Sequence, residues 1–232
     1  MKVSVCMAIY NGEKFIEEQI SSILPQLKEN DELIISDDGS TDNTLDLIYD
    51  INDKRIKVHS SNGGNIVRNF ENALKKASGD VIFLSDQDDI WYSNKVNIVL
   101  GFIKKYDLVF SNASVFSNNL NQTKDLYVPG PERIGLLRNI IKNNYIGATM
   151  AFNKKVLDKA LPFPKNIYMH DVWLGVIAEF VGKTYYIDEP LIYYRRHDNN
   201  ASETGEKSSN SLGKKIKMRL TLGVCLLSRM LC

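Results

Sequence analysis

Short apolar runs alternate with segments of helical periodicity through the first half of the chain, which strongly constrains the fold. The runs are short enough to be buried strands; they occupy residues 3–9, 33–35, 56–58, 81–85 and 108–111. Between them, helical spacing of apolar residues predicts helices over 13–28, 66–77 and 94–105, and another that begins around Thr41-Asp42. Such alternation predicts an α/β fold with a Rossmann-like, mostly parallel central sheet and helices on both faces.

The second half of the chain is less regular and predicts a smaller region attached to that sheet. Polar residues at 117–133 indicate a loop, and residues 171–181 have the spacing of a helix. After a polar linker at 198–210, residues 212–232 predict a separate amphipathic helix that carries five Lys and Arg residues and no acid. Short strands are expected at 147–153, 185–187 and 191–194.

Three carboxylates directly follow the apolar run 81–85: Asp86, Asp88 and Asp89. Mutual repulsion and desolvation make such a cluster unfavourable unless a positive group binds there. A divalent cation shared with the phosphate groups of a substrate would meet that need. In an open α/β sheet, ligands bind at the carboxyl ends of strands, where this cluster falls. A solvated acidic loop is the alternative.

Other loops are expected at the same edge of the sheet. Asp38 follows the second apolar run and can accept hydrogen bonds from a base or a ribose, although an ordinary Asp-Gly turn is the alternative. Arg68 can clamp a phosphate or stack on a base, or else form a surface salt bridge. Asp171 follows His170 and would also suit the first turn of a helix.

Charge and cysteine content narrow the class of protein. The formal net charge of +1 gives no field that would attract nucleic acid. The three cysteines are far apart in the sequence and indicate neither a metal site nor a disulfide framework, which favours a reducing compartment. The sequence has no signal peptide and no apolar run long enough to span a bilayer. We therefore expect a cytoplasmic protein without a nucleic-acid partner.

An ordered set of motifs resembles glycosyltransferase family 2, whose members have the GT-A fold. Within that family the chain is most similar to bacterial rhamnosyltransferase-type enzymes, which share Ser-Asp-Gln-Asp-Asp-Ile-Trp at 85–91 and Met-His-Asp-x-Trp at 169–173. The resemblance covers about residues 1–200. The matching pieces, in order, are 3–12, 36–44, Asn62-Gly63-Gly64 with Arg68-Asn69, 79–89, His170-Asp171 and 194–197.

The resemblance implies a role for each matched residue. Asp171 would be the catalytic base, and Asp88 would bind Mn²⁺ or Mg²⁺. His197 would complete the metal or diphosphate site, with a surface histidine as the alternative. Asp38 would contact the base and Asp86 the ribose. The whole nucleotide-sugar set comprises Ala8, Tyr10, Asp38, Arg68, Asp86 and Gln87.

These roles imply an inverting glycosyltransferase that works by a metal-assisted single displacement. The donor would be a UDP- or dTDP-sugar, and the acceptor a hydroxyl of a glycan or lipid-linked glycan in bacterial surface polysaccharide synthesis. Residues 1–111 would bind the nucleotide sugar, and 112–200 would supply the acceptor site and the base. Residues 201–232 would form the linker and basic helix.

Alternative interpretations remain open at the level of sequence. A sugar-nucleotide or glycan binding module would keep the site without transfer activity. A metal-dependent nucleotidyltransferase would also use a nucleotide and an α/β sheet, but it favours a basic glycine-rich loop after the first strand. An aspartyl-phosphate phosphatase would place its acidic motif there. The basic helix would contact the inner face of the plasma membrane, pack on the domain, or pair with a second subunit in a homodimer.

Overall fold

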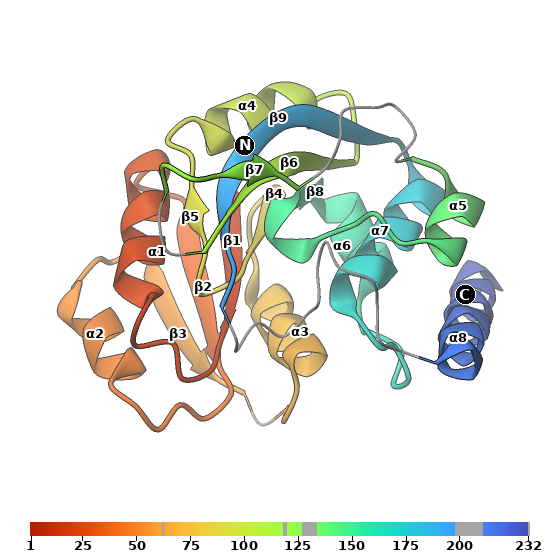
Figure 1. Ribbon diagram of the computed structural model, residues 1–232, viewed down its shortest axis with the longest axis horizontal. Helices are drawn as coiled ribbons and strands as arrows, with labels where there is room; N and C mark the ends of the chain where they lie inside the picture. The colour runs from red at the N-terminus through yellow and green to blue at the C-terminus, as the bar shows by residue number, and fades with distance from the viewer. Residues whose placement is uncertain (62, 118–119, 127–133, 198–210, 232) are drawn as a thin grey trace.

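The computed structural model describes residues 1–61, 63–117, 120–126, 134–197 and 211–231 (Figure 1). The expected linker at 198–210, part of the expected loop at 117–133, and Asn62 lie outside the described residues. The strands are β1 (Val3–Ile9), β2 (Glu32–Asp37), β3 (Ile56–Ser60), β4 (Val81–Ser85), β5 (Ile90–Trp91), β6 (Leu108–Phe116), β7 (Lys124–Asp125), β8 (Met150–Asn153) and β9 (Thr184–Arg195). They form one sheet in the order β3-β2-β1-β4-β8-β6-β9-β5, and β7 pairs with β6.

Strands β3, β2, β1 and β4 are parallel neighbours and confirm the α/β fold that the apolar runs predict. Every residue of β1, β2 and β4 is buried. Parallel strands buried on both faces have nearly continuous apolar sequences, which is why their positions could be predicted. The loops that follow these strands gather at one edge of the sheet, because their carboxyl ends meet there.

The other half of the sheet is less parallel than expected. β8 is antiparallel to both β4 and β6. The two short strands expected at 185–187 and 191–194 are one strand, β9, which pairs in parallel with β6. Pro190 is tolerated there because the pairing shifts register around Asn112, its partner on β6. The boundary expected after residue 111 falls within β6, and the division into donor and acceptor halves stays a prediction.

The helices include those expected in the first half of the chain, with shorter bounds. The helix expected over 13–28 ends early in a 3₁₀ turn that contains Pro25, because proline has no N–H to continue α-helical bonding. The strand expected over 147–153 starts only at Met150. The helices are α1 (Ile16–Ile23), α2 (Thr44–Asp50), α3 (Ile66–Lys76), α4 (Lys95–Phe102), α5 (Leu136–Ile141), α6 (Lys154–Ala160), α7 (His170–Val181) and α8 (Leu212–Leu231), with 3₁₀ turns η1 (Leu24–Gln26) and η2 (Gly147–Thr149).

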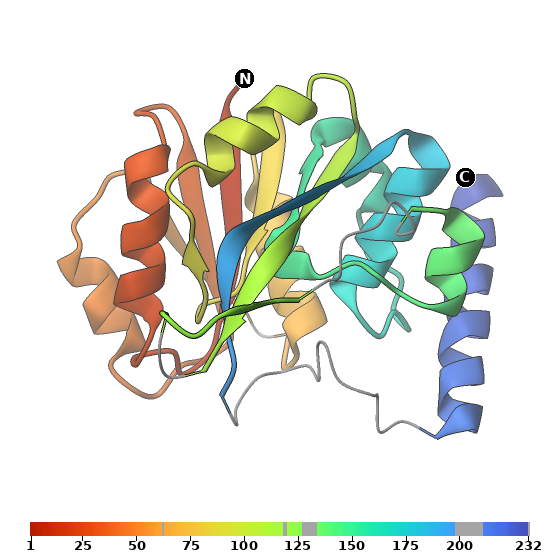
Figure 2. The same cartoon turned by 45° about the horizontal axis from the view of Figure 1, so that its top comes forward.

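Helices cover both faces of the sheet (Figure 2). An apolar core lies on each of these faces. One contains side chains of α1 and α4, such as Ile20 and Val99. The other contains side chains of α3, α6, α7 and α8, such as Phe70, Trp173 and Leu222. α8 therefore packs on the body of the molecule, beside α5 (Figure 1). None of the described helices is both long and apolar enough to cross a membrane.

Candidate active site

A cavity of about 550 Å³ opens where β1, β2 and β4 end, at the edge of the sheet that the sequence predicts for a ligand. α3, α7 and β9 complete its wall with Asn69, His170 and Tyr194. The structure thus brings together most of the predicted site residues from loops far apart in the sequence. Those that line the cavity are Ala8, Tyr10, Asp38, Asp86, Gln87, Asp88 and Asp171.

Asp38 lies directly after β2 and is held by backbone groups. Its Oδ1 accepts a 3.1 Å hydrogen bond from the N–H of Gly64, and its own N–H donates to the carbonyl of Ile9 at 3.1 Å. Gly64 has a φ of +62°, a conformation that glycine adopts without strain. These contacts fix the Asp38 carboxylate in the cavity wall, where it can accept a hydrogen bond from a base or a hydroxyl group.

Gln87 links the loops that follow β1 and β4. Its side chain accepts a 2.9 Å hydrogen bond from the N–H of Tyr10 and donates one of 3.1 Å to the carbonyl of Tyr10. These two hydrogen bonds fix one wall of the cavity, to which Ala8 also belongs.

The carboxylates after β4 destabilise one another, as their crowding in the sequence predicts. Burial, and then the charges of Asp88 and Asp171, raise the pKa of Asp86 to about 7. Burial also raises the pKa of Asp89, whose Oδ1 accepts a 3.0 Å hydrogen bond from the N–H of Arg195. A cation bound beside such carboxylates would favour their charged forms.

Lys95 is a charged residue beneath the acidic cluster that the sequence analysis missed. It is fully buried, its Nζ donates a 2.7 Å hydrogen bond to the carbonyl of Ala148, and Nζ lies 4.1 Å from the centroid of the Trp91 ring. Burial lowers the pKa of Lys95 to about 7, although the charges of Asp89 and Asp86 oppose that shift. The available signal was its position four residues before Val99, on the apolar face of the expected helix.

Asp88 lines the cavity and contacts His197, which is not among the lining residues, although 109 positions separate the two in the sequence. His197 Nε2 lies 2.8 Å from Asp88 Oδ2, and its ring stacks on Phe15 with the centroids 4.9 Å apart. A carboxylate and an imidazole at this spacing suit a divalent cation that takes its other ligands from phosphate and water. Within the described residues, no group of three or more His, Cys, Asp or Glu side chains could hold a metal ion by itself. Phosphate or water would have to supply the other ligands.

Asp171 lies in the first turn of α7, inside the cavity. Burial raises the pKa of Asp171 to about 6, although hydrogen bonds from the N–H groups of Val172 and Gly147 oppose that shift. The bond from Val172 is 2.7 Å long. A carboxylate with this pKa is ionised at neutral pH and more basic than an exposed aspartate. Asp171 therefore has the properties of a general base.

His170 lines the cavity, and the sequence analysis gave it no role. Only 3% of it is exposed, and its ring stacks on Phe70 with a centroid distance of 4.0 Å. Burial lowers the pKa of His170 to about 3, so the ring is neutral at physiological pH. Neither ring nitrogen has a hydrogen-bond partner among the described residues.

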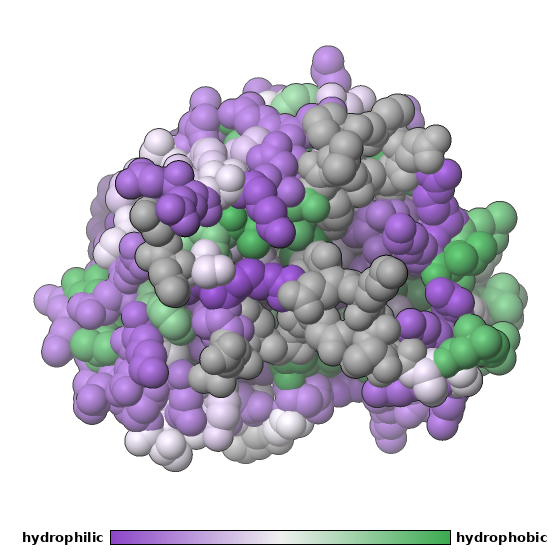
Figure 3. All heavy atoms as spheres, viewed as in Figure 1, coloured by the Kyte–Doolittle hydropathy of each residue, from purple (hydrophilic) through white to green (hydrophobic). Residues whose placement is uncertain are grey.

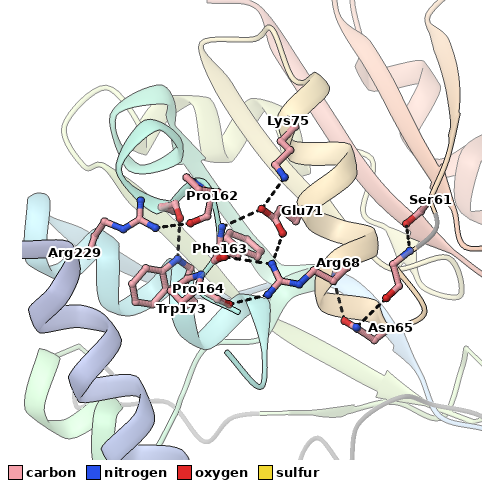
Figure 4. Close-up of polar contacts among 12 residues, drawn as sticks. Ser61, Asn65, Arg68, Glu71, Lys75, Pro162, Phe163, Pro164, Trp173 and Arg229 are labelled. Atoms are coloured by element: carbon pink, nitrogen blue, oxygen red, sulfur yellow. Dashed lines mark hydrogen bonds and ion pairs between the residues drawn. The ribbon is translucent and has the colours of Figure 1, made fainter. Parts of the chain in front are cut away.

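Arg68 is the one predicted nucleotide-binding residue that does not line the cavity. Its guanidinium pairs with Glu71 and donates to the carbonyl oxygens of Phe163 and Pro164, at 3.3 Å and 2.8 Å (Figure 4). The salt bridge expected as the alternative is therefore present. Arg68 joins α3 to the segment before α7 instead of facing the cavity.

Comparison with known families and proteins agrees with this arrangement. The sequence model described as Glycosyl transferase family 2 matches residues 4–161. The chain is 31% identical to the dTDP-rhamnosyl transferase RfbG of Shigella flexneri, over 84% of this chain and 72% of that protein. It is 32% identical to a UDP-Glc:alpha-D-GlcNAc-diphosphoundecaprenol beta-1,3-glucosyltransferase, WfgD of Escherichia coli, over 76% of this chain and 70% of that protein.

Solved structures share the fold. Staphylococcus aureus TarS 1–349 in complex with UDP-GlcNAc superimposes with a TM-score of 0.75 at 22% identity, over 98% of this chain and 67% of that chain. Glucosyl-3-phosphoglycerate synthase from Mycobacterium tuberculosis was crystallised with Mn²⁺, UDP and phosphoglyceric acid. It superimposes with a TM-score of 0.61 at 20% identity, over 98% of this chain and 78% of that chain. At these identities the likeness establishes the GT-A fold.

Proposed function

Because the chain belongs to glycosyltransferase family 2, we propose that it transfers a sugar from a UDP- or dTDP-sugar to a glycan hydroxyl with inversion at the anomeric carbon. The observation that carries this proposal is the cavity itself. Its lining includes the Asp38 carboxylate, which would accept a hydrogen bond from the nucleotide, the Asp88 carboxylate beside His197, and the buried carboxylate of Asp171. The base or ribose of the donor would bind Asp38, and its diphosphate would bind near Asp88 and His197. The acceptor hydroxyl would lie beside Asp171.

Asp171 would take the proton of the acceptor hydroxyl as its oxygen attacks the anomeric carbon. The bond from that carbon to the diphosphate breaks as the new glycosidic bond forms, which inverts the anomeric configuration. Burial supports this role because it raises the pKa of Asp171 toward the working pH. General-base assistance of this kind contributes about 10²- to 10⁴-fold in rate.

Asp88 and His197 would hold Mn²⁺ or Mg²⁺ together with the donor diphosphate. Such an ion neutralises negative charge on a leaving diphosphate. Support comes from the 2.8 Å contact between the two side chains and from related folds crystallised with Mn²⁺ or Mg²⁺ and UDP. Asp86 and Asp89 would add negative charge near that position, and Lys95 would limit it.

The acceptor is proposed to be a glycan carried on a lipid diphosphate. WfgD, whose name gives such an acceptor, supports this proposal. Residues 1–111 would bind the donor and 112–200 the acceptor, with Ile146 to Gly147 and Met169 to Asp171 on the acceptor side of the cavity. A cytoplasmic location at the inner face of the plasma membrane and a homodimer remain expectations from the sequence.

Release of UDP or dTDP from a panel of nucleotide sugars, with and without Mn²⁺, tests the proposed activity. We expect metal-dependent release that accelerates with a GlcNAc-diphospho-lipid acceptor, and a product of inverted anomeric configuration by NMR. Donor binding without any release, with acceptor present, would instead indicate a binding module. Release of inorganic diphosphate from a nucleoside triphosphate would indicate a nucleotidyltransferase.

A further inference from the structure

A second, open groove of about 1000 Å³ lies between α3, the segment 162–165 and α8. Four cationic side chains and one carboxylate line it: Arg68, Lys75, Lys165, Arg229 and Glu71. Figure 4 shows how the groups from α3 and from α8 approach the segment 162–164 from two sides. Among the described residues, positive charge therefore exceeds negative charge in this groove.

The single carboxylate of the groove is fully engaged. Glu71 is almost buried and pairs with both Arg68 and Lys75, and it accepts a 3.1 Å hydrogen bond from the N–H of Phe163. Arg229 donates to the carbonyl oxygens of Leu161 and Pro162, which carry no net charge. The charge of Arg229 and that of the exposed Lys165 are thus not neutralised by Glu71, and they suit an anionic group.

A groove of about 450 Å³ with an apolar stripe continues from this basic groove along α8, and the side chains of Asn166, Lys217 and Thr221 also line it. The two grooves share Val224 and Cys225, and the apolar one adds Ile216 and Leu220. Leu220 is 65% exposed and Val224 66% exposed, whereas Leu222 and Leu226 on another face of α8 are buried against the body. α8 thus has one apolar face that packs and one that is open to solvent. Figure 3 shows apolar side chains where Figure 1 places α5 and α8.

The basic groove lies next to the cavity that we assign to the reaction. α3 separates the two: Ile66 and Asn69 face the cavity, while Arg68 and Glu71 line the groove. The cavity and the basic groove therefore flank the same helix.

We propose that the two grooves bind one phosphorylated lipid, with its phosphate groups beside Lys165 and Arg229 and its hydrocarbon chain along Leu220 and Val224 of α8. The charges and the apolar stripe are complementary to these two parts of one molecule. This inference rests on the proposed function, because it gives the acceptor its carrier.

Farnesyl diphosphate is a soluble probe that has both a diphosphate group and a hydrocarbon chain. Inorganic diphosphate has only the first of these parts, and farnesol only the second. Titration calorimetry without metal should give farnesyl diphosphate at least about tenfold tighter binding than either fragment, a difference of about 1.4 kcal/mol or more, because it contacts both grooves. Prior saturation with UDP should not displace it, because UDP is expected in the other cavity. Equal affinity for farnesyl diphosphate and inorganic diphosphate would overturn the proposal, as would no binding at all.

Paired variants assign the two parts of the probe. The variant Lys165→Gln should weaken binding of both diphosphates about tenfold, since it removes a charge-assisted contact. The double variant Leu220→Ser/Val224→Ser should bind inorganic diphosphate as the wild type does. Its affinity for farnesyl diphosphate should fall to that for inorganic diphosphate. Lys104→Gln, an exposed lysine after α4, and Leu137→Ser, an exposed leucine on α5, are matched controls that should change nothing.

Two further measurements distinguish a lipid site from a membrane-binding surface and test it separately from the proposed function. Binding of the protein to phosphatidylglycerol vesicles is measured with and without farnesyl diphosphate. Vesicle binding that farnesyl diphosphate does not inhibit would indicate a membrane-binding surface and would contradict a site for a single lipid. Nucleotide-sugar binding measured in parallel should be unchanged in every groove variant. If the wild type binds farnesyl diphosphate but no nucleotide sugar, the proposed function fails and the lipid site stands.

Discussion

At the residue scale, the buried carboxylate of Asp171 is the base that we propose for the reaction. Since the base must be ionised and its pKa is about 6, kcat/KM should rise about tenfold per pH unit below that value. Asp171→Asn should reduce transfer by about 10²- to 10⁴-fold and leave the donor dissociation constant unchanged. Initial rates and calorimetry on the same samples check both. Undiminished transfer by the variant would remove Asp171 from the reaction.

The same shift makes stability depend on pH. Because the pKa of Asp171 rises from 3.8 to about 6 on folding, the folded state holds this proton more tightly, and its contribution to stability is lost as pH rises through about 6. Asp171→Asn should therefore be more stable than the wild type at pH 8, by up to about 3 kcal/mol, and nearly equal at pH 4. Urea unfolding at both pH values measures the difference, and the same difference at both would contradict the buried charge.

Single residues differ in how far the sequence could predict them. The placement of Asp86, Asp88 and Asp171 could be predicted because each lies in a motif at the end of a strand or the start of a helix. Lys95 and His170 owe their properties to burial by residues distant in the sequence, such as Ala148 and Phe70. The hydrogen bonds of Arg68 to the carbonyl oxygens of Phe163 and Pro164 could not be predicted, because these residues are distant in the sequence.

At the scale of elements, close packing of α7 against the loop before η2 positions Gly147 at the cavity. A Cβ on Gly175 would lie 2.1 Å from Cδ2 of Tyr145, whose ring packs against α7 and whose hydroxyl donates to Glu179. Gly175→Ala should therefore destabilise the protein by about 1–3 kcal/mol through overpacking.

Gly223→Ala provides the matched control, because a Cβ at this position of α8 meets no atom within 4 Å. Replacing a helix-interior glycine by alanine should stabilise the protein by up to about 1 kcal/mol. Chemical denaturation gives both values. A fall in stability for Gly223→Ala as large as that for Gly175→Ala would mean that the packing of Tyr145 is not the cause.

Elements in the first half of the chain could be predicted better than those in the second half. β1, β2 and β4 are buried on both faces, so their composition alone indicates strands. β9 is partly exposed and contains Pro190, and only its pairing with β6 makes it one strand. The short helices α5 and α6 have too few residues for a clear periodicity.

At the scale of the whole molecule, donor binding should stabilise the fold, because the cavity is built from loops of both halves of the chain. A nucleotide sugar at about a hundred times its dissociation constant adds about 2.7 kcal/mol to the free energy of unfolding. Thermal unfolding with UDP-, dTDP- and GDP-sugars should show that increase for a uridine or thymidine donor. An equal shift with all three would mean that the base is not recognised at Asp38.

The pairing of Asp88 with His197 connects the loop after β4 to the end of β9, and its proposed role is to bind a metal ion together with the donor diphosphate. Titration calorimetry of the preferred nucleotide sugar tests it most directly, in Mn²⁺ and in EDTA, on the wild type and on Asp88→Asn. We expect Mn²⁺ to tighten binding by about tenfold or more in the wild type and to have no effect in the variant. Equal affinity in Mn²⁺ and in EDTA for the wild type would contradict that role.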